Sequence, residues 1–140
     1  MGKLDFSSLK IKEIDCVIKY TAKKMEFTTK NRHNHIIGIH LSGSAVHYFK
    51  NQKFTISENC IYFLNQNEDY KVKVLEKGVA FSVHFTTYEP IDTESYCIKT
   101  AKANEIVRLL SLIEKEFLSK NNDLALMSDL YGLCSELNKI

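Results

Sequence analysis

Residues 70–74, Tyr70-Lys71-Val72-Lys73-Val74, alternate strictly between apolar and charged side chains, and this alternation decides the fold class. Successive side chains of a β-strand point to opposite faces of its sheet. We therefore expect the two lysines to face water, and Tyr70, Val72 and Val74 to face a buried interior. The stretch predicts a strand with one solvated and one buried face.

Short runs rich in aromatic and β-branched residues lie on both sides of this strand. Turn-forming residues separate them, among them Ser42-Gly43-Ser44, Asn51-Gln52 and Lys77-Gly78. The expected strands cover residues 14–22, 35–41, 45–50, 53–56, 60–65, 70–75 and 79–85, and the polar stretch 28–34 is expected to be a connection. Several hairpins at this spacing predict an antiparallel sandwich or barrel over residues 1–100.

The composition changes near residue 100, where Leu, Glu, Lys and Ala at helical spacing replace the earlier runs. One stripe on a helix face is formed by Ile106, Leu109, Leu110, Ile113 and Phe117. Asn121-Asn122-Asp123 interrupts this pattern, and Asp123 is expected to be the N-cap of a second helix. Residues 101–140 are therefore predicted to form a two-helix segment of the same domain.

The second predicted helix carries apolar residues spaced 4-3-4-3, which are Leu126, Leu130, Leu133, Leu137 and Ile140. A second stripe beside them consists of Met127, Tyr131 and Cys134. Such a helix is either buried against the sheet and the first helix or forms a subunit interface. We expect a homodimer whose interface contains Leu126, Leu130, Tyr131, Leu133, Cys134 and Leu137.

The composition excludes several classes of protein. The chain has 140 residues, 44% of them apolar, and 19 Lys+Arg against 17 Asp+Glu give a net charge of +2. This length fits one domain, and the small charge argues against direct binding of nucleic acid or of an anionic membrane. The four cysteines form no Cys-x-x-Cys pair, and residues 1–6 lack the apolar run that a signal peptide needs, so we expect none; no long apolar stretch occurs in the sequence either. We expect a soluble, cytoplasmic protein.

Histidines are the residues best suited to chemistry in this sequence. His33, His35 and His40 are a candidate metal site of the kind used by metal-dependent cupin enzymes, which are isomerases or dioxygenases on small β-barrels. The glutamate expected four or five positions after His35 is absent, and Tyr70 stands where a further histidine ligand is expected. No phosphate-binding or nucleophile motif occurs either. We expect no metal, no cofactor and no enzyme activity.

Three segments carry a family resemblance, namely residues 39–44 (Ile-His-Leu-Ser-Gly-Ser), 59–68 (Asn-Cys-Ile-Tyr-Phe-Leu-Asn-Gln-Asn-Glu) and 81–85 (Phe-Ser-Val-His-Phe). In this order and spacing the chain resembles the N-terminal sensor domain of AraC-type bacterial transcription regulators. The sequence departs from that pattern at Gln66, which replaces a turn proline, and at Tyr70, which replaces a frequent histidine. Both departures argue against metal binding.

The resemblance implies a cupin-like antiparallel β-barrel of the jelly-roll type, followed by two α-helices. It also implies a small-molecule effector in the barrel, a homodimer, and DNA binding only through a C-terminal helix-turn-helix domain. That domain would follow Ile140 and is missing from this chain, so we expect a truncated regulator, with a natural stand-alone domain as the alternative. A pure dimerisation module with a filled barrel is a further possibility.

The effector would contact polar groups inside the barrel. The candidate ligand-binding residues are His35, His40, His47, Tyr48, Tyr62, Asn65, Tyr70 and His84. The N-terminal segment up to about Lys12 is expected to lie across the mouth of the barrel, as an arm does in arabinose-responsive members of the family.

Overall fold

Nine strands and two α-helices follow one another in the computed structural model, which describes residues 3–23, 25–120 and 123–140. The elements are η1 (Phe6–Ser8), β1 (Ile11–Ala22), β2 (Glu26–Thr29), β3 (His35–His40), β4 (Ser44–Tyr48), β5 (Lys53–Ile56), β6 (Cys60–Leu64), β7 (Tyr70–Glu76), β8 (Gly78–Thr87), β9 (Tyr96–Lys99), α1 (Ala103–Ser119) and α2 (Asp123–Leu137).

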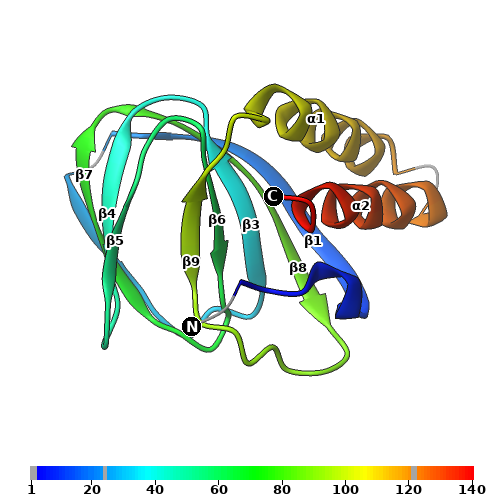
Figure 1. The fold of residues 1–140 in the computed structure, drawn as a ribbon, viewed down its shortest axis with the longest axis horizontal. Coiled ribbons are helices and arrows are strands. Elements are labelled where there is room, and N and C mark those ends of the chain that lie inside the picture. Colours follow the sequence, from blue (N-terminus) through cyan, green and yellow to red (C-terminus); the bar gives the residue numbers. More distant parts are fainter. Residues whose placement is uncertain (1–2, 24, 121–122) are drawn as a thin grey trace.

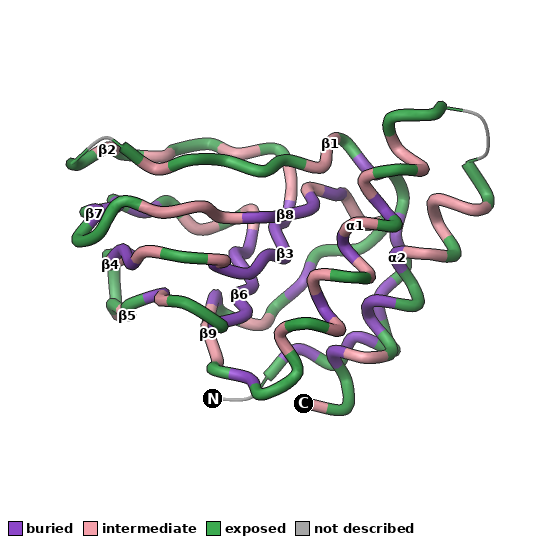
Figure 2. The backbone as a smooth tube through the Cα atoms, turned by 90° about the horizontal axis from the view of Figure 1, so that it is seen from above, coloured by how far each residue is buried: buried purple, intermediate pink, exposed green. Residues whose placement is uncertain are grey.

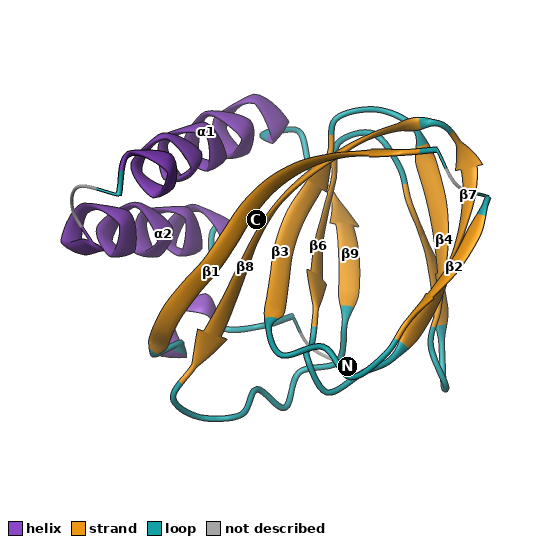
Figure 3. Ribbon diagram, turned by 180° about the vertical axis from the view of Figure 1, so that it is seen from behind, coloured by secondary structure: helices purple, strands orange, loops and turns teal. Residues whose placement is uncertain are grey.

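The strands form two sheets that face each other, and the two helices cover the outer face of one of them (Figures 1 and 3). The five-stranded sheet has the order β1-β8-β3-β6-β9, and the four-stranded sheet has the order β2-β7-β4-β5. Every ladder between neighbouring strands is antiparallel. The predicted class, an antiparallel jelly-roll barrel followed by two helices, is confirmed.

The alternation that predicted β7 is observed, because Tyr70, Val72 and Val74 are buried and the two lysines between them are exposed. Two strands were not predicted. Both β2 and β9 have only four residues, and β2 lies partly in the polar stretch that was expected to be a connection. Each stands at a sheet edge, where one strand neighbour suffices.

The five-stranded sheet is buried on both faces, and it therefore separates two apolar cores. In β3, Ile36 belongs to the core between the sheets, whereas the next residue, Ile37, belongs to the core beneath the helices. Every residue of β3 and β6 is buried for this reason. Figure 2 shows buried residues along these strands, between the second sheet and the helix pair.

The first helix confirms the predicted stripe, since Ile106, Leu110 and Ile113 are buried against the sheet. The break expected at Asn121-Asn122 lies outside the described residues. Asp123 was expected to be an N-cap, but it already belongs to α2 in the described part of the chain. No helix in the described part of the chain is long and apolar enough to cross a membrane.

The predicted dimer seam is wrong for four of its six residues, because α2 buries Leu130, Leu133, Cys134 and Leu137 inside the chain, whereas Tyr131 is 39% exposed. Leu130 and Leu133 are fully buried in the core beneath the helices, and Cys134 and Leu137 are buried with them. Leu126 packs partly against the same core. The Tyr131 hydroxyl accepts a hydrogen bond from the Ile11 amide at 2.8 Å. A helix that covers both α1 and a sheet needs the same apolar width as one that covers a second subunit.

The N-terminal segment also lies elsewhere than expected. Residues 3–10 run along the helix side of the five-stranded sheet and not across the barrel mouth. The Phe6 amide donates to Asn138 Oδ1 at 2.8 Å, and the Leu4 amide donates to the Tyr96 hydroxyl at 3.2 Å. The segment is held there because Leu4, Phe6 and Leu9 are buried in the core beneath the helices.

Candidate ligand-binding site

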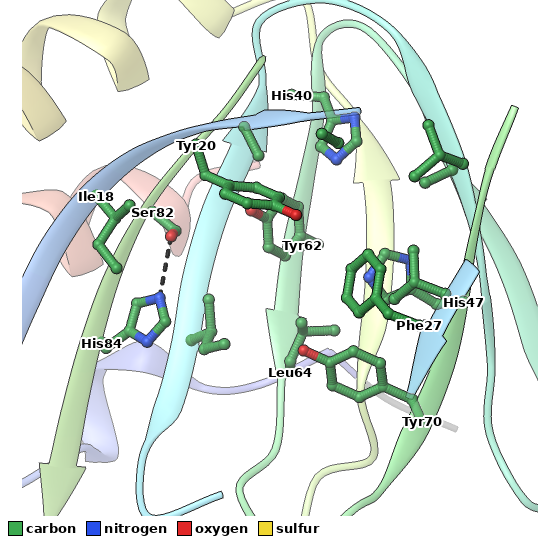
Figure 4. A pocket seen from close by; sticks show the side chains of 16 residues that line it. Ile18, Tyr20, Phe27, His40, His47, Tyr62, Leu64, Tyr70, Ser82 and His84 are labelled. Atoms are coloured by element: carbon green, nitrogen blue, oxygen red, sulfur yellow. Dashed lines mark hydrogen bonds between the residues drawn. The ribbon is translucent and has the colours of Figure 1, made fainter. Parts of the chain in front are cut away.

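A cavity of about 240 Å³ lies between the two sheets (Figure 4). Seven strands contribute to its lining. Four belong to the five-stranded sheet, namely β1, β8, β3 and β6, and three belong to the four-stranded sheet, namely β2, β7 and β4. Most of the wall is apolar and includes Phe27, Ile36, Ala45, Leu64, Val72 and Val74. A concave apolar space with a few polar groups is the usual composition of a small-molecule site.

Strand alternation decides which side chains reach the cavity. In β8, Ala80, Ser82 and His84 line it, whereas Phe81 and Val83 between them belong to the core beneath the helices. Gly38 of β3 also has an inward position. A Cβ there would overlap the Tyr62 hydroxyl and would come within 2.9 Å of the Ser82 Cβ. The glycine therefore leaves the space that the Tyr62 phenol occupies.

The cavity opens at the edge of the barrel formed by β1. Ile18 and Tyr20 of β1 both line the cavity, yet they are 38% and 45% exposed. Strands β1 and β2 each stand at the edge of their own sheet. The opposite edges, β5 and β9, are joined by the Cys97 thiol, which donates to the Thr55 carbonyl at 3.5 Å. The mouth of the site is therefore on the β1 side.

Two buried imidazoles point into the cavity (Figure 4). His40 is 8% exposed and His47 is 7% exposed. Within the described residues, the Nδ1 atom of each has no hydrogen-bond partner. A buried polar atom without a partner costs free energy of about 1–3 kcal/mol, so such atoms are usually satisfied by water or by a ligand. These two nitrogens are the strongest indication of a binding site.

Aromatic neighbours fix the orientation of both rings. The His47 ring is nearly parallel to the Phe54 ring, at 10° and 6.0 Å between centroids. It also lies 5.1 Å from the Tyr70 ring. The His40 ring meets the Tyr62 ring edge-on, at 82° and 5.7 Å. Side chains locked by packing present their polar atoms in one direction, which favours selective binding.

Burial keeps the histidines of the cavity uncharged. Desolvation lowers the pKa of His47 to about 3, and the proximity of His40 and of the Arg32 charge lowers it further. Desolvation also lowers the pKa of His40, against a hydrogen bond with the Gly43 backbone, and the pKa of His84. Each imidazole is thus neutral near pH 7 and offers one donor and one acceptor.

The hydroxyl groups of the wall are neutral as well. Burial raises the pKa of the Tyr62 phenol far above its usual range, and it also raises the pKa of Tyr70. Ser82 Oγ lies 3.2 Å from His84 Nε2, which forms a second polar group near the mouth. The site can therefore form hydrogen bonds but carries no formal charge of its own.

Five of the predicted ligand-binding residues come together in this cavity, and these are His40, His47, Tyr62, Tyr70 and His84. Three do not line it. Tyr48 has an outward position in β4 and is 38% exposed. His35 and Asn65 lie at the end of the barrel, where each forms hydrogen bonds with loop backbone.

His35 faces the core beneath the helices, because it is five positions from the inward-facing His40 on the same strand. Its Nδ1 accepts a hydrogen bond from the Gln66 amide at 3.1 Å, and its ring stacks on Phe63. Asn65 fastens the 88–95 loop, since its Nδ2 donates to the carbonyls of Ile91 and Thr93. Both residues were predicted to bind a ligand because they are polar, and this property does not distinguish them from the residues that line the cavity.

Eleven of the sixteen lining residues were not predicted as ligand-binding residues, and Tyr20, Phe27 and Ser82 are among them. Ser82 could have been found from its sequence position, because it shares the strand face of His84. Phe27 belongs to the unpredicted strand β2.

The alternative metal site receives no support from the geometry. His33 is exposed, His35 faces the helix side of β3, and His40 faces the cavity. Across the described ranges, no group of three His, Cys, Asp or Glu side chains is placed to hold a metal ion. The three histidines do not converge, because β3 places His35 and His40 on opposite faces and His33 lies before the strand.

Comparison with known proteins gives structural but not sequence relatives. No protein-family model matches the chain, and no curated protein matches its sequence. A crystal structure of ToxT from Vibrio cholerae with a bound unsaturated fatty acid superposes with a TM-score of 0.61 and 14% identity. The match covers 93% of this chain and 56% of that chain.

Two further structures match in the same way. ToxT bound to (E)-4-(8-methylnaphthalen-1-yl)but-3-enoic acid gives a TM-score of 0.60 at 15% identity, over 91% of this chain and 57% of that chain. The AraC-like transcriptional activator CuxR gives a TM-score of 0.57 at 7% identity, over 85% of this chain and 52% of that chain. This chain thus spans about half the length of these proteins, and it has a fold that occurs in AraC-like transcription regulators.

Proposed function

We propose that this chain is the effector-binding part of an AraC-type transcription regulator. A small molecule in the cavity would control DNA binding by a helix-turn-helix domain outside this chain. The observation that carries the proposal is the apolar cavity with two buried, unpartnered imidazole nitrogens, from His40 and His47. The shared fold with ToxT and CuxR, and the ligands bound to ToxT, support it.

The five-stranded sheet offers a route from the cavity to the helices. In β8, Ser82 faces the cavity and the adjacent Val83 packs beneath the helices. In β3, Ile36 and Ile37 are related in the same way. A ligand that alters the position of this sheet would therefore also alter the support of α1 and α2. A ligand shifts such an equilibrium only by its difference in affinity for the two arrangements.

A homodimer in the bacterial cytoplasm remains part of the proposal, because paired DNA-binding domains are implied by the family resemblance. The buried leucines of α2 cannot form its interface without unfolding the chain. A second copy would have to contact the surface of the molecule elsewhere.

The proposal is tested by titrating the purified chain with four compounds at pH 7.5, which are 3-phenylpropan-1-ol, indole, 3-phenylpropanoate and nonanoate. At least one is expected to bind with a stoichiometry of one, measured by calorimetry. The Ala80→Phe variant fills the cavity from β8 and should weaken that binding at least tenfold. Thr55→Phe adds the same side chain to an exposed position of β5 and should leave binding unchanged.

Binding by none of the four compounds, or undiminished binding by a folded Ala80→Phe variant, would refute a ligand-binding cavity. Ala22→Phe, at the partly exposed end of β1, fills the same space and replaces Ala80→Phe if that variant does not melt cooperatively.

A further inference from the structure

The first feature that limits the ligand is the absence of charge in the cavity wall. None of the sixteen described residues that line the cavity is Asp, Glu, Lys or Arg. Transfer of an ionised carboxylate or ammonium group from water to such a space is strongly unfavourable unless an opposite charge meets it. A charged ligand group would find no such partner in this wall.

One cation near the cavity, Arg32, belongs to the loop before β3. Backbone carbonyls hold its two terminal nitrogens, whereas its buried Nε has no hydrogen-bond partner among the described residues. Arg32 donates from Nη1 to the Asn34 carbonyl at 2.9 Å and from Nη2 to the Asn65 carbonyl at 2.6 Å. Its guanidinium carbon lies over the Tyr70 ring, 5.1 Å from the centroid, and Arg32 does not line the cavity. Its charge lowers the pKa of His47 and His84, which helps to keep both imidazoles neutral.

The second feature is the hydrogen-bonding capacity of the wall. The unpartnered Nδ1 atoms of His40 and His47 belong to neutral rings. The His47 ring can donate one hydrogen bond and accept another, whereas the His40 ring already has a hydrogen bond with the Gly43 backbone. A hydroxyl or carbonyl group can satisfy such a nitrogen without transferring charge into the cavity.

The third feature is size. A cavity of 150 Å³ holds one benzene molecule, so by proportion about 240 Å³ accommodates roughly ten non-hydrogen atoms. One aromatic ring with a chain of three or four atoms fills this volume. The exposed side chains of Ile18 and Tyr20 at the mouth leave an access route for a molecule of that width.

We propose that the cavity binds an uncharged, mainly apolar molecule of roughly ten non-hydrogen atoms with one hydroxyl or carbonyl group near His40 and His47, and that it selects against carboxylates. This inference rests on the proposed function and specifies its ligand. It distinguishes this chain from ToxT, whose bound ligands are carboxylic acids.

The test compares two ligands with the same skeleton, 3-phenylpropan-1-ol and 3-phenylpropanoate, by calorimetry at pH 7.5. The alcohol is expected to bind at least ten times more tightly. When the pH is lowered to 5.5, the acid should bind more tightly because a larger fraction carries its proton, while the affinity for the alcohol changes less than twofold. A smaller preference, or tighter binding of the acid at pH 7.5, overturns the inference.

The outcomes also separate this inference from the proposed function. Tight binding of the carboxylate alone would leave a ligand-binding cavity in place and refute only its preference for uncharged ligands. Binding of neither compound, and of neither indole nor nonanoate, would refute both.

Two variants locate the polar contact. His40→Phe and His47→Phe each remove an Nδ1 atom and keep a ring, so each should weaken binding of 3-phenylpropan-1-ol at least fivefold. Propylbenzene, which lacks the hydroxyl group, should bind each variant within twofold of the unmodified chain. The matched control is Tyr48→Phe, which removes a hydroxyl group next to His47 but outside the cavity. Equal loss of both ligands would mean that the imidazoles only pack, which contradicts the inference.

A third variant keeps the test decisive if the histidine variants do not fold. Tyr20→Lys places an ammonium group at the exposed mouth, where its charge can remain hydrated. The variant should bind 3-phenylpropanoate at least three times more tightly than the unmodified chain does. No gain would contradict the view that a missing cation excludes carboxylates.

Discussion

Gly38 of β3 lies opposite Tyr62 of β6, so close that a Cβ at residue 38 would overlap the phenol oxygen. Both residues face the space between the sheets. The Tyr62 ring in turn meets the His40 ring edge-on. The placement of the His40 ring thus depends on Tyr62, and the placement of Tyr62 depends on the lack of a side chain at Gly38.

The Gly38→Ala variant is expected to lose about 1–3 kcal/mol of unfolding free energy, because an added methyl group overpacks a dense region. Displacement of Tyr62 should also weaken binding of 3-phenylpropan-1-ol. Urea denaturation and calorimetry measure the two effects.

The matched control is Gly132→Ala in α2, where a Cβ would meet no atom within 4 Å. Alanine favours a helix by up to about 1 kcal/mol over glycine, so this variant should be more stable than the unmodified chain. Equal stability of the two alanine variants would contradict the close approach at Gly38.

The leucine series of α2 is expected to determine folding and not association. Leu130→Ala should lower the unfolding free energy by about 2–5 kcal/mol, because Leu130 is fully buried within the chain. Leu130→Glu should prevent folding, as judged by far-UV circular dichroism. The exposed Leu124 is the control, and its replacement by alanine should change stability by less than about 0.5 kcal/mol. A Leu130→Glu variant that folds and is monomeric would contradict this expectation and would support α2 as a subunit interface.

The chain should become less stable as the pH falls from 7 to 5. Burial lowers the pKa of His47 to about 3 and that of His35 to about 4, whereas an unfolded histidine titrates near 6.5. The unfolded state therefore binds protons first, and the stabilisation present above pH 6.5 is lost as the pH falls through this window. Each such histidine contributes up to about 1.4 kcal/mol per pH unit below its unfolded pKa.

Urea denaturation at pH 7, 6 and 5 measures this slope above the usual range of carboxyl groups. His47→Phe should flatten it, whereas His33→Gln should not, because His33 is exposed. Stability that is constant or rises toward pH 5 would contradict the burial of neutral imidazoles.

The two arginines of the sequence should differ sharply in their tolerance of lysine. Arg32 holds the carbonyls of Asn34 and Asn65 with separate nitrogens, a geometry that the single ammonium of lysine does not reproduce. Arg32→Lys should lower the unfolding free energy by about 2 kcal/mol. Arg108→Lys should leave the urea midpoint unchanged, because its partner Glu105 and the guanidinium are both exposed. Equal effects would mean that Arg32 acts only as a charge.

Much of the fold could be predicted from local patterns. The alternation at residues 70–74 determined β7 and its buried face, and the range 53–56 coincides with β5. Short edge strands such as β9 carry too few residues for a reliable alternation, and their pairing with β6 depends on distant residues. Local sequence does not contain that information.

The site was predicted less completely than the fold. The face of a sheet on which a side chain lies, and the element that packs against a helix, are determined only when the elements assemble. His40 and His35 are the same residue type on one strand, and only their odd spacing places them on opposite sides. The spacing of Leu130 and Leu133 fits a subunit interface as well as packing within the chain. The choice between these depends on the position of α1, which no heptad pattern specifies.

The central claim is that the barrel holds a small molecule between His40 and His47. The most direct measurement is a ¹H–¹⁵N NMR titration of the chain with 3-phenylpropan-1-ol. Saturable shifts are predicted for the amides of His40, His47 and Ser82, with smaller shifts on the helix-facing neighbour Val83. Shifts confined to the exposed surfaces of α1 and α2, or no saturable shifts up to the solubility limit of the alcohol, would contradict it.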